Sequence, residues 1–357
     1  FKEISYFSRF KYNAFYMTET AIVILNWNTK HYLQQFLPGL IEHSQQPGVE
    51  IVVADNGSND GSVQFLEKNF PKVRLIRLDK NYGFTGGYNK ALSQIKARYY
   101  LILNSDIKVT PEWIEPMRSI MEKDPSVGAC MPKIKSYHKT EFFEYAGAAG
   151  GFIDKLGYPF CRGRIIDVLE EDRGQYNDET EIFWATGACM MIRADLFNEL
   201  GGFDDDFFAH MEEIDLCWRM KHKGYKIMYT PESTIYHIGG GTLSSDSPFK
   251  LYLNYRNNLS LLYKNVPSKY FITTLLERTF LDIASAFVYL IQGKPKSFLA
   301  VFKAHMKFFG NLKPLTQKRK QIHRNEKRFP LEVFKKSMLY EFYFRKKKYY
   351  RQLTDNH

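Results

Sequence analysis

Short apolar segments alternate with stretches of helical periodicity in the first third of the chain. The stretch between the first two segments places Leu33, Phe36 and Leu40 three and four positions apart, as on one face of a helix. Parallel strands need a crossover connection, usually a helix, so this alternation predicts an α/β fold around a mostly parallel sheet. The expected strands are residues 21–25, 50–54, 73–78 and 99–103.

Polar clusters stand at the ends of these apolar segments. In open parallel sheets, ligands bind beyond the carboxyl ends of the strands, where the connecting loops meet. We therefore expect the clusters to line one ligand site. They cover residues 26–28, 55–60, 81–89 and 104–106.

The length of 357 residues and the hydrophobic fraction of 44% allow a large core. After about residue 125 the pattern becomes glycine-rich and aromatic, and from residue 269 apolar residues recur at helical spacing. We expect an N-terminal extension over 1–16 with Met17 as the native start, a main domain over 17–268, and a helical appendage over 269–357. The main domain divides into halves over 17–125 and 126–268.

Cysteine usage and hydropathy indicate the cellular compartment in which the protein is expected. The four cysteines include no Cys-x-x-Cys pair, so neither a zinc site nor a disulfide framework is indicated and a reducing compartment is expected. No uninterrupted apolar run approaches the roughly 20 residues that span a bilayer. Residues 1–16 offer no apolar signal core, so secretion is not expected.

The positive charge is concentrated near the C-terminus. Residues 311–351 hold 14 Lys or Arg against three Glu, which accounts for the whole net charge of +11. Before them, apolar residues at helical spacing between Phe271 and Phe309 lie near Lys294 and Lys303, as in helices that rest in a lipid headgroup layer. An anionic membrane surface is the expected partner. A helical lid, a homo-oligomer interface or a solvated tail stays open.

Three of the polar clusters have both an ordinary and a functional interpretation. The cluster at Asp55 is an Asx-rich turn or a loop whose carboxylate accepts a hydrogen bond from a pyrimidine ring N–H. The turn from Asn81 to Asn89 opens a helix whose glycines allow a ligand to approach the backbone. The triplet Asn104, Ser105 and Asp106 is a turn or a site where a strand-end carboxylate holds a divalent cation.

Acidic residues crowd one segment of the second half. Glu212, Glu213 and Asp215 are three carboxylates in four positions. They form the first turn of a helix, where negative charge complements the dipole, or a site that uses negative charge. Downstream, His237 precedes Gly239–Gly241 and is a structural histidine or a metal ligand.

Taken in order, these motifs resemble those of the family 2 inverting glycosyltransferases with the GT-A fold, particularly the bacterial rhamnosyltransferase-like group. The resemblance covers roughly residues 20 to 260, and five or more ordered motifs rarely coincide by chance. The matching segments are residues 21–28, 55–62, 81–89, 103–106, 184–193, 201–219 and 237–242.

The resemblance implies a nucleotide-sugar site at the strand ends. Asp55 would read the nucleobase, and Asp106 would be the metal-binding last acid of an Asp-x-Asp motif whose first acid is replaced by Asn104. His237 would complete a site for Mg²⁺ or Mn²⁺. The remaining donor-side residues are Asn26, Asn28, Asn81, Gly83, Phe84, Gly87, Asn89 and Ser105, with Arg256 as a diphosphate contact or a structural arginine.

The resemblance also assigns roles to Glu212, Glu213 and Asp215, which we call the acidic row. Glu213 takes the place of the catalytic base, with Glu212 beside it and Asp215 in a structural or acceptor-orienting role. The acceptor-side segment contributes Trp184, Thr186 and Gly187.

The implied activity is inverting transfer of a sugar to a hydroxyl of a glycan or polyprenyl-diphosphate-linked acceptor in bacterial cell-surface polysaccharide synthesis. The first choice of donor is dTDP-L-rhamnose, and a UDP-hexose is the alternative. The expected location is cytoplasmic, at the inner face of the cytoplasmic membrane. A non-catalytic nucleotide-sugar-binding protein also stays open. So does a nucleic-acid-binding one through the tail at 345–350, although nothing in the first 260 residues supports it.

Overall fold

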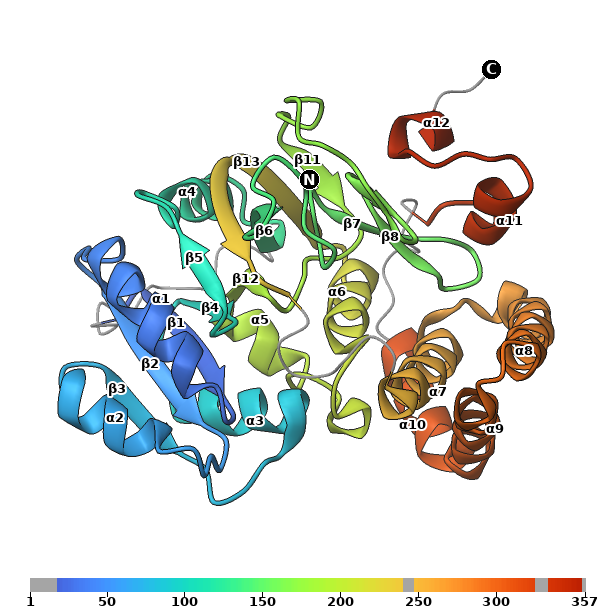
Figure 1. Cartoon of the computed structure of the whole chain (residues 1–357), viewed down its shortest axis with the longest axis horizontal. Coiled ribbons are helices and arrows are strands. Elements are labelled where there is room, and N and C mark those ends of the chain that lie inside the picture. The colour runs from blue at the N-terminus through green and yellow to red at the C-terminus, as the bar shows by residue number, and fades with distance from the viewer. Residues whose placement is uncertain (1–17, 240–246, 325–332, 355–357) are drawn as a thin grey trace, which may run out of the picture.

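The computed structural model describes residues 18–239, 247–324 and 333–354, and its centre is one twisted β-sheet (Figure 1). The expected extension over 1–16, Met17 and residues 240–242 lie outside the described residues. The strands follow the spatial order β11-β13-β6-β12-β4-β1-β2-β3, and β5 pairs with β13. Their bounds are β1 Thr20–Asn26, β2 Val49–Asp55, β3 Arg74–Arg77, β4 Tyr99–Leu103, β5 Ile107–Val109, β6 Val127–Ser136, β11 Thr180–Ile182, β12 Cys189–Arg193 and β13 Lys226–His237.

The half of the sheet formed by β3, β2, β1 and β4 is parallel throughout. Helical connections join these strands because each chain crossover must return to the same edge. The four expected strands and the α/β class are thereby confirmed. The helices of this half are α1 Lys30–Glu42, α2 Ser62–Asn69 and α3 Gly83–Leu92.

The other half of the sheet mixes strand directions. β12 runs antiparallel to both of its neighbours, β4 and β6, whereas β13 runs parallel to β6. β13 continues past Pro231 to His237 because a register shift between Thr230 and Thr234 keeps the proline out of the ladder. The helices here are α4 Glu115–Lys123, α5 Ala194–Glu199, the 3₁₀ turn η1 Asp205–Phe207, and α6 Glu212–His222.

A small second sheet lies beside the main one. Its strands are held close to the core by Gly151, where a Cβ atom would stand 2.1 Å from the ring of Trp184. Only glycine leaves room for this contact. The strands are β7 Gly151–Ile153, β8 Pro159–Cys161, β9 Arg164–Ile165 and β10 Val168–Leu169.

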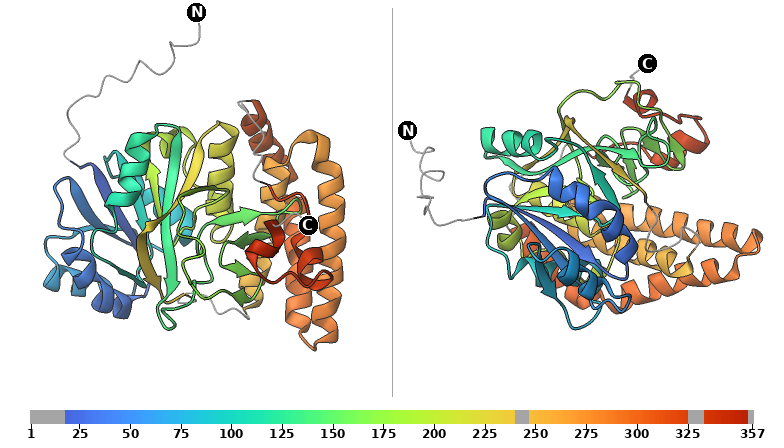
Figure 2. Two further views of the ribbon diagram at one scale, coloured as in Figure 1. Left: turned by 90° about the horizontal axis from the view of Figure 1, so that it is seen from above. Right: turned by 60° about the vertical axis from the view of Figure 1, so that its left-hand side comes forward.

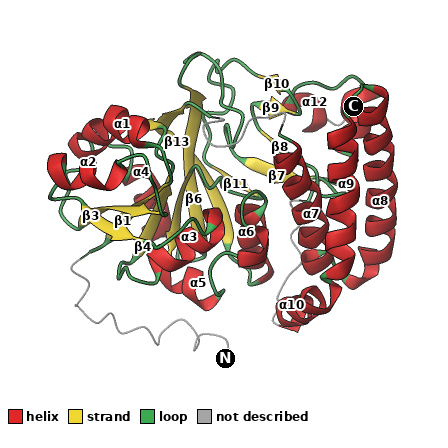
Figure 3. Cartoon of the chain, turned by 60° about the horizontal axis from the view of Figure 1, so that its bottom comes forward, coloured by secondary structure: helices red, strands yellow, loops and turns green. Residues whose placement is uncertain are grey.

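Helices form a separate layer at the C-terminal side (Figure 2). In Figure 3, α6 lies between the sheet and α7, with α8 and α9 beyond α7. The helical layer begins with α7, before residue 269, and the domain limits expected from the sequence stay a prediction. The helices of this layer are α7 Pro248–Asn265, α8 Ser268–Ile291, α9 Pro295–Gly310 and α10 Leu312–Arg324. Two short helices, α11 Met338–Tyr343 and α12 Tyr350–Thr354, pack instead on the small second sheet. Among the described residues, no helix is both long and apolar enough to cross a membrane.

A buried polar network attaches α8 and α9 to α7. Arg278 of α8 pairs with Asp282 one turn later at 2.6 Å, and it also donates to the side-chain carbonyl of Asn258 on α7. The second Asp282 oxygen lies 3.2 Å from Nε2 of His305 on α9. Because all these groups are buried and mutually bonded, they fix the relative positions of the three helices.

Replacing Arg278 by Ala should lower the free energy of unfolding by about 3–5 kcal/mol, because the Asp282 carboxylate loses its charged partner inside the protein. Urea unfolding followed by circular dichroism measures this change. Glu277→Ala is the matched control, since Glu277 makes an exposed ion pair with Lys155 that is worth roughly 1 kcal/mol at most. Equal losses in the two variants would contradict the anchoring role.

Candidate active site

The carboxyl ends of β1 and β2 bring Asn26 and Asp55 together, as neighbours in register. The Asn26 side-chain amide donates to Asp55 at 2.9 Å, and the Ser58 backbone N–H donates to the other Asp55 oxygen at 3.0 Å. Asn28, in a left-handed conformation with φ of 55°, accepts from the Asn59 N–H at 2.8 Å. These hydrogen bonds therefore hold together the two predicted donor-side loops, which follow β1 and β2.

The glycine-rich turn before α3 packs against the segment that leads into α6. Gly83 has a φ of 73°, and a Cβ atom there would stand 2.5 Å from the ring of Phe208. The Phe84 backbone N–H donates to the Phe208 carbonyl at 2.7 Å. Gly187 in turn leaves room for the Phe84 ring, which a Cβ would approach to 2.9 Å. These contacts bring predicted donor-side and acceptor-side residues to one place.

The other residues of this turn make contacts within the protein that stabilise the turn and its neighbours. The Asn81 side-chain oxygen accepts from the Gly83 N–H at 2.8 Å and from Asn56 at 3.0 Å. Asn89 binds the backbone of Phe203 in both directions, with its amide donating at 2.8 Å and its oxygen accepting at 2.9 Å. At Gly87, a Cβ would lie 2.7 Å from Leu25.

Asp106 and His237, far apart in the sequence, face each other across 3.2 Å. Asn104 lies 3.4 Å from the same His237 nitrogen, and the Ser105 hydroxyl bonds Thr29 at 3.0 Å. The sequence could not show the first proximity. It arises because β5, which follows Asp106, pairs with the end of β13 that carries His237.

Glu144 is a second acidic group beside His237, and sequence reasoning did not identify it. Its carboxylate lies 3.4 Å from Nδ1 of His237. Burial alone lowers the pKa of His237, but the carboxylates of Glu144 and Asp106 outweigh burial and raise it to about 10. The pKa of Asp106 is lowered, since its hydrogen bond from His237 overcomes the opposite effect of burial.

A metal-ligating imidazole must be neutral, so a bound cation would take the place of the proton that Asp106 and Glu144 favour on His237. With His237 neutral, the donor set at Asp106 and His237 fits a divalent cation that shares its other ligands with a diphosphate. Within the described residues, no group of three or more His, Cys, Asp or Glu side chains could hold a metal ion. One carboxylate and one imidazole are nevertheless a sufficient protein contribution when phosphate oxygens and water complete the shell, as at many nucleotide sites. Both side chains are buried at the sheet edge where the resemblance places the metal.

A strained segment precedes the acidic row. Phe208, His210 and Met211 all have positive φ, between 64° and 72°, which costs non-glycine residues energy. Asn257 on α7 holds this segment, because its side-chain amide donates to the carbonyls of Phe207, Ala209 and His210 at 3.0, 2.8 and 2.7 Å. The conformation is therefore imposed from α7.

Arg256 contributes to the same attachment. Its guanidinium donates to the carbonyls of Asp206 and Phe207, each at 2.9 Å. These bonds favour the structural alternative for Arg256, and its contact with a diphosphate stays a prediction.

Glu212 and Glu213 open α6 and present carboxylate oxygens that have no hydrogen-bond partner in the described part of the chain. Burial, reinforced by the neighbouring Glu213 carboxylate, raises the pKa of Glu212 well above its ordinary value. Burial likewise raises the pKa of Glu213 to about 7. The ionisation of one carboxylate disfavours that of the other, so the two titrate as a coupled pair. The pair is thus poised to exchange a proton near neutral pH.

His210 adds a third unpartnered group. Sequence reasoning also left it out, although it lies only two residues before Glu212. Its Nε2 atom is buried without a partner among the described residues. Burial, followed by the charge of Lys250, lowers the pKa of His210 to about 4, so the ring is neutral at pH 7. Buried polar atoms without partners are rare in proteins, and a cluster of them indicates a place where a ligand binds.

Asp215 stands apart from the acid pair. It is fully buried and pairs with Arg219 at 2.8 Å and with Lys264 of α7 at 2.9 Å. Asn265 donates to it as well, at 2.9 Å. Burial opposes its ionisation, but Lys264 and Arg219 lower its pKa overall. Of the two roles expected for Asp215, these contacts support the structural one.

The acceptor-side residues are enclosed. The Trp184 indole N–H donates to the Phe152 carbonyl at 2.8 Å, and the Thr186 hydroxyl accepts from the Ala188 N–H at 3.2 Å. The Ala185 N–H bonds the Cys217 sulfur of α6 at 3.5 Å. This segment therefore supports α6 from the side of the sheet.

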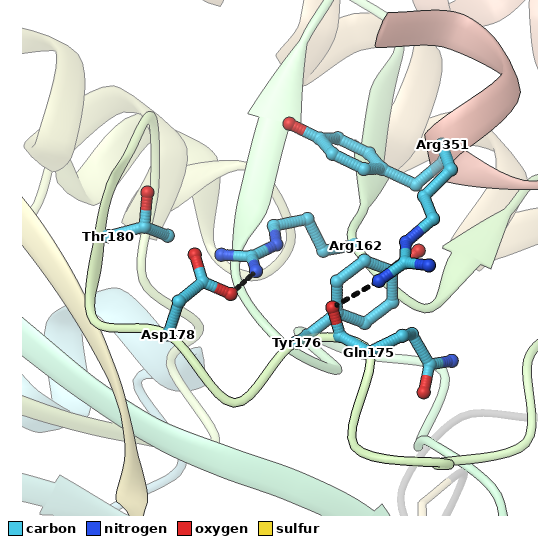
Figure 4. Close-up of a pocket in the computed structure, with 7 residues that line it drawn as sticks. Arg162, Gln175, Tyr176, Asp178, Thr180 and Arg351 are labelled. Carbon is cyan, nitrogen blue, oxygen red and sulfur yellow. Dashed lines mark hydrogen bonds and ion pairs between the residues drawn. The ribbon is translucent and has the colours of Figure 1, made fainter. Parts of the chain in front are cut away.

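A pocket of about 250 Å³ lies elsewhere, between the loop at residues 175–180 and α12 (Figure 4). Its polar groups bond one another: Arg162 pairs with Asp178, and Arg351 donates to the Gln175 carbonyl at 3.1 Å. It includes none of the predicted site residues, and its satisfied polar groups give no sign of a missing ligand.

Comparison with known proteins bears on this arrangement. The family model described as glycosyl transferase family 2 matches residues 21–201. The N-acetylglucosaminyl-diphospho-decaprenol L-rhamnosyltransferase of Mycobacterium tuberculosis is 26% identical over 231 residues, which is 60% of this chain and 75% of that relative. A hexosyltransferase of low-salt glycan biosynthesis from Haloferax volcanii is 23% identical over 247 residues, covering 68% of this chain and 74% of the relative.

Two solved structures share the fold. GalNAc-T7 with UDP, GalNAc and Mn²⁺ aligns with a TM-score of 0.54 and 16% identity, over 70% of this chain and 48% of its own. The mannosyltransferase PcManGT from Pyrobaculum calidifontis, in complex with GDP-Man and Mn²⁺, aligns with a TM-score of 0.50 and 14% identity, over 87% and 86% of the two chains. The resemblance identified in the sequence and the GT-A fold are confirmed, and the chain belongs to glycosyl transferase family 2.

Proposed function

We propose that this glycosyltransferase moves a sugar, with inversion, from a nucleotide-sugar donor to an acceptor hydroxyl, and that Glu213 is the catalytic base. The observation that carries the proposal is the acid pair at the start of α6, in which Glu212 is buried, Glu213 is partly exposed, and each presents a buried carboxylate oxygen that has no partner among the described residues. The segment before it is bonded to the turn that opens α3, so the pair lies beside the predicted donor loops.

The reaction is one in-line displacement. Glu213 accepts the proton of the acceptor hydroxyl while that oxygen bonds the anomeric carbon, and the bond from this carbon to the nucleoside diphosphate breaks with its electrons leaving on the phosphate. Asp55, fixed by Asn26, would accept from a base N–H. A bound Mg²⁺ or Mn²⁺, held by Asp106 and His237, would neutralise charge on the leaving diphosphate.

The donor we favour is dTDP-L-rhamnose, and the acceptor is a glycan on a polyprenyl diphosphate in bacterial cell-surface polysaccharide synthesis. The name of the M. tuberculosis relative supports L-rhamnose as the sugar and a polyprenyl diphosphate as the carrier of the acceptor. A UDP-hexose is the second candidate, which the name of the Haloferax relative favours. The enzyme would then work at the inner face of the cytoplasmic membrane, where such acceptors are exposed.

A donor panel tests the proposal directly. With Mn²⁺ and a short-chain, water-soluble N-acetylglucosaminyl diphosphate lipid as acceptor, we expect transfer from dTDP-L-rhamnose and little from UDP-glucose or UDP-galactose. Preferential transfer from a UDP-hexose would replace the donor but keep the reaction. Neither transfer nor donor hydrolysis with any sugar would indicate a non-catalytic binding protein and refute the proposal.

Glu213→Gln should lower kcat by about 10²–10⁴-fold, since the amide cannot accept the acceptor proton. Steady-state rates on purified, folded protein measure this loss. Asp215→Asn is the informative comparison, because it weakens the pairing with Lys264 and Arg219 and should act on stability more than on kcat. Near-normal transfer by Glu213→Gln, combined with loss of transfer in folded Asp215→Asn, would assign the base to Asp215.

The raised pKa of Glu213 should also appear in the pH dependence of stability and rate. Between the unfolded-state pKa near 4.3 and about 7, the native protein retains a proton that the unfolded chain has released, so stability falls as the pH rises. Glu213→Gln should therefore be more stable than the wild type at pH 8, by on the order of 2 kcal/mol, with the difference shrinking towards pH 4. Urea unfolding at the two pH values measures it.

In the wild type, kcat should rise with pH up to about 7, where Glu213 becomes ionised. A stability difference between Glu213→Gln and the wild type that does not change with pH would show that Glu213 is ionised across the range.

A further inference from the structure

The outward face of α8 is apolar, and its inward face is polar. Positions four apart, namely Thr274, Arg278, Asp282 and Ala286, are buried against the protein. Surface helices of soluble proteins show the opposite arrangement, with charged residues towards water. The exposed large apolar side chains of α8 are Ile272, Leu276, Phe280, Ile283, Phe287, Val288, Leu290 and Ile291, and Phe280 is 72% exposed.

The apolar surface continues onto α9. Phe298 at the start of α9 lies 5.8 Å from the ring of Phe287 and 4.9 Å from that of Phe302, so the aromatic contacts run from one helix to the other. The exposed apolar residues of α9 are Leu299, Phe302, Met306 and Phe309. We call these outward residues of the two helices the α8–α9 face. Apolar surface that is continuous over two helices marks an interaction site.

Glu277, in the first half of α8, is an exposed acid that pairs with Lys155. Beyond Asp282 the charges along the α8–α9 face have one sign. From Ile283 to Arg324 the sequence contains no Asp or Glu and nine Lys or Arg. Four lysines, Lys294 and Lys296 at the hairpin and Lys303 and Lys307 along α9, are exposed. A lysine can lay its apolar stem along such a surface while its ammonium group reaches outward to an anion.

We propose that the α8–α9 face docks on a lipid bilayer that contains anionic headgroups, with its apolar side chains in the acyl boundary and its lysines at the phosphates. The inference rests in part on the proposed function, because a lipid-linked acceptor must be met at the membrane. The favoured partner follows from charge. A symmetric dimer would press the same face against itself and set lysines against lysines, whereas an anionic surface complements them.

Docking in this manner would orient the candidate active site relative to the bilayer. Arg278 connects α8 to Asn258 of α7, and the adjacent Asn257 holds the strained segment before the acid pair. The membrane-facing helices and the proposed base are thus attached to neighbouring residues of one helix. No movement of these elements is needed for the orientation.

Vesicle flotation tests the proposal with the full chain. We expect binding to phosphatidylcholine vesicles that include phosphatidylglycerol, and much weaker binding to phosphatidylcholine alone. The double variant Phe280→Ser with Met306→Ser should weaken binding by about 10- to 100-fold, because two exposed apolar groups no longer enter the lipid. Lys303→Glu with Lys307→Glu should weaken it on anionic vesicles only.

Phe344→Ser is the matched control, since Phe344 is 77% exposed at the end of α11, outside the α8–α9 face. It should leave flotation unchanged. An equal loss in this control and in the double variant would move the contact to the C-terminal basic segment and overturn the assignment. Unchanged flotation of the double variant would also overturn the assignment. The same holds if the wild type is a dimer that the double variant converts to monomer without affecting flotation.

Activity on two acceptors separates this inference from the proposed function. The double variant should transfer sugar to the water-soluble acceptor at the wild-type rate and be impaired only on an acceptor embedded in vesicles. Loss of transfer to both acceptors with normal flotation would count against the docking role of this face. Flotation that follows the prediction in a protein without any transferase activity would support docking and refute the proposed function.

Discussion

The attachment of α6 to α7 is the constraint on which the candidate active site depends. Three non-glycine residues before α6 adopt left-handed conformations, each at a cost of roughly 1–3 kcal/mol. The side-chain amide of Asn257 and the guanidinium of Arg256 offset this cost by binding the carbonyls that such a turn leaves free. The buried ion pair between Asp215 of α6 and Lys264 of α7 attaches the two helices at a second point. The proposed base is therefore positioned by a helix that lies outside the residues matched by the family model.

The same attachment explains why a buried carboxylate, Glu212, and a partly exposed one, Glu213, are tolerated side by side. Their location in the first turn of α6 supplies free backbone N–H groups and a favourable dipole, as the ordinary interpretation of the acidic row holds. Burial nevertheless raises the pKa of Glu213 to about 7. A group that ionises near neutral pH at an energetic cost suits proton transfer, whereas the fully paired Asp215 suits anchoring. Helix capping and base chemistry are thus compatible explanations of one segment.

The C-terminal helices show how a polar network can determine which side of a helix faces outward. Inside the protein, Arg278 and Asp282 bond each other, Arg278 bonds Asn258, and Asp282 bonds His305. The aromatic residues of α8 are therefore left on the outer surface. The spacing of apolar residues predicted an amphipathic helix. It favoured an apolar side that faces a lipid surface but left open a lid packed on the protein, because a hydrophobic stripe alone has no reference to the rest of the fold.

From the sequence alone, the alternation of strands and helices determined the α/β class, and the order of the motifs determined the family, since both are properties of spacing along the chain. It also placed the polar clusters at the strand ends, where Asn26 and Asp55 are now neighbours. Only the tertiary structure decided which distant groups meet. Strand pairing set His237 beside Asp106 and Glu144, and helix packing paired Asp215 with Lys264. These outcomes depend on contacts between residues up to 131 positions apart, which no local pattern encodes.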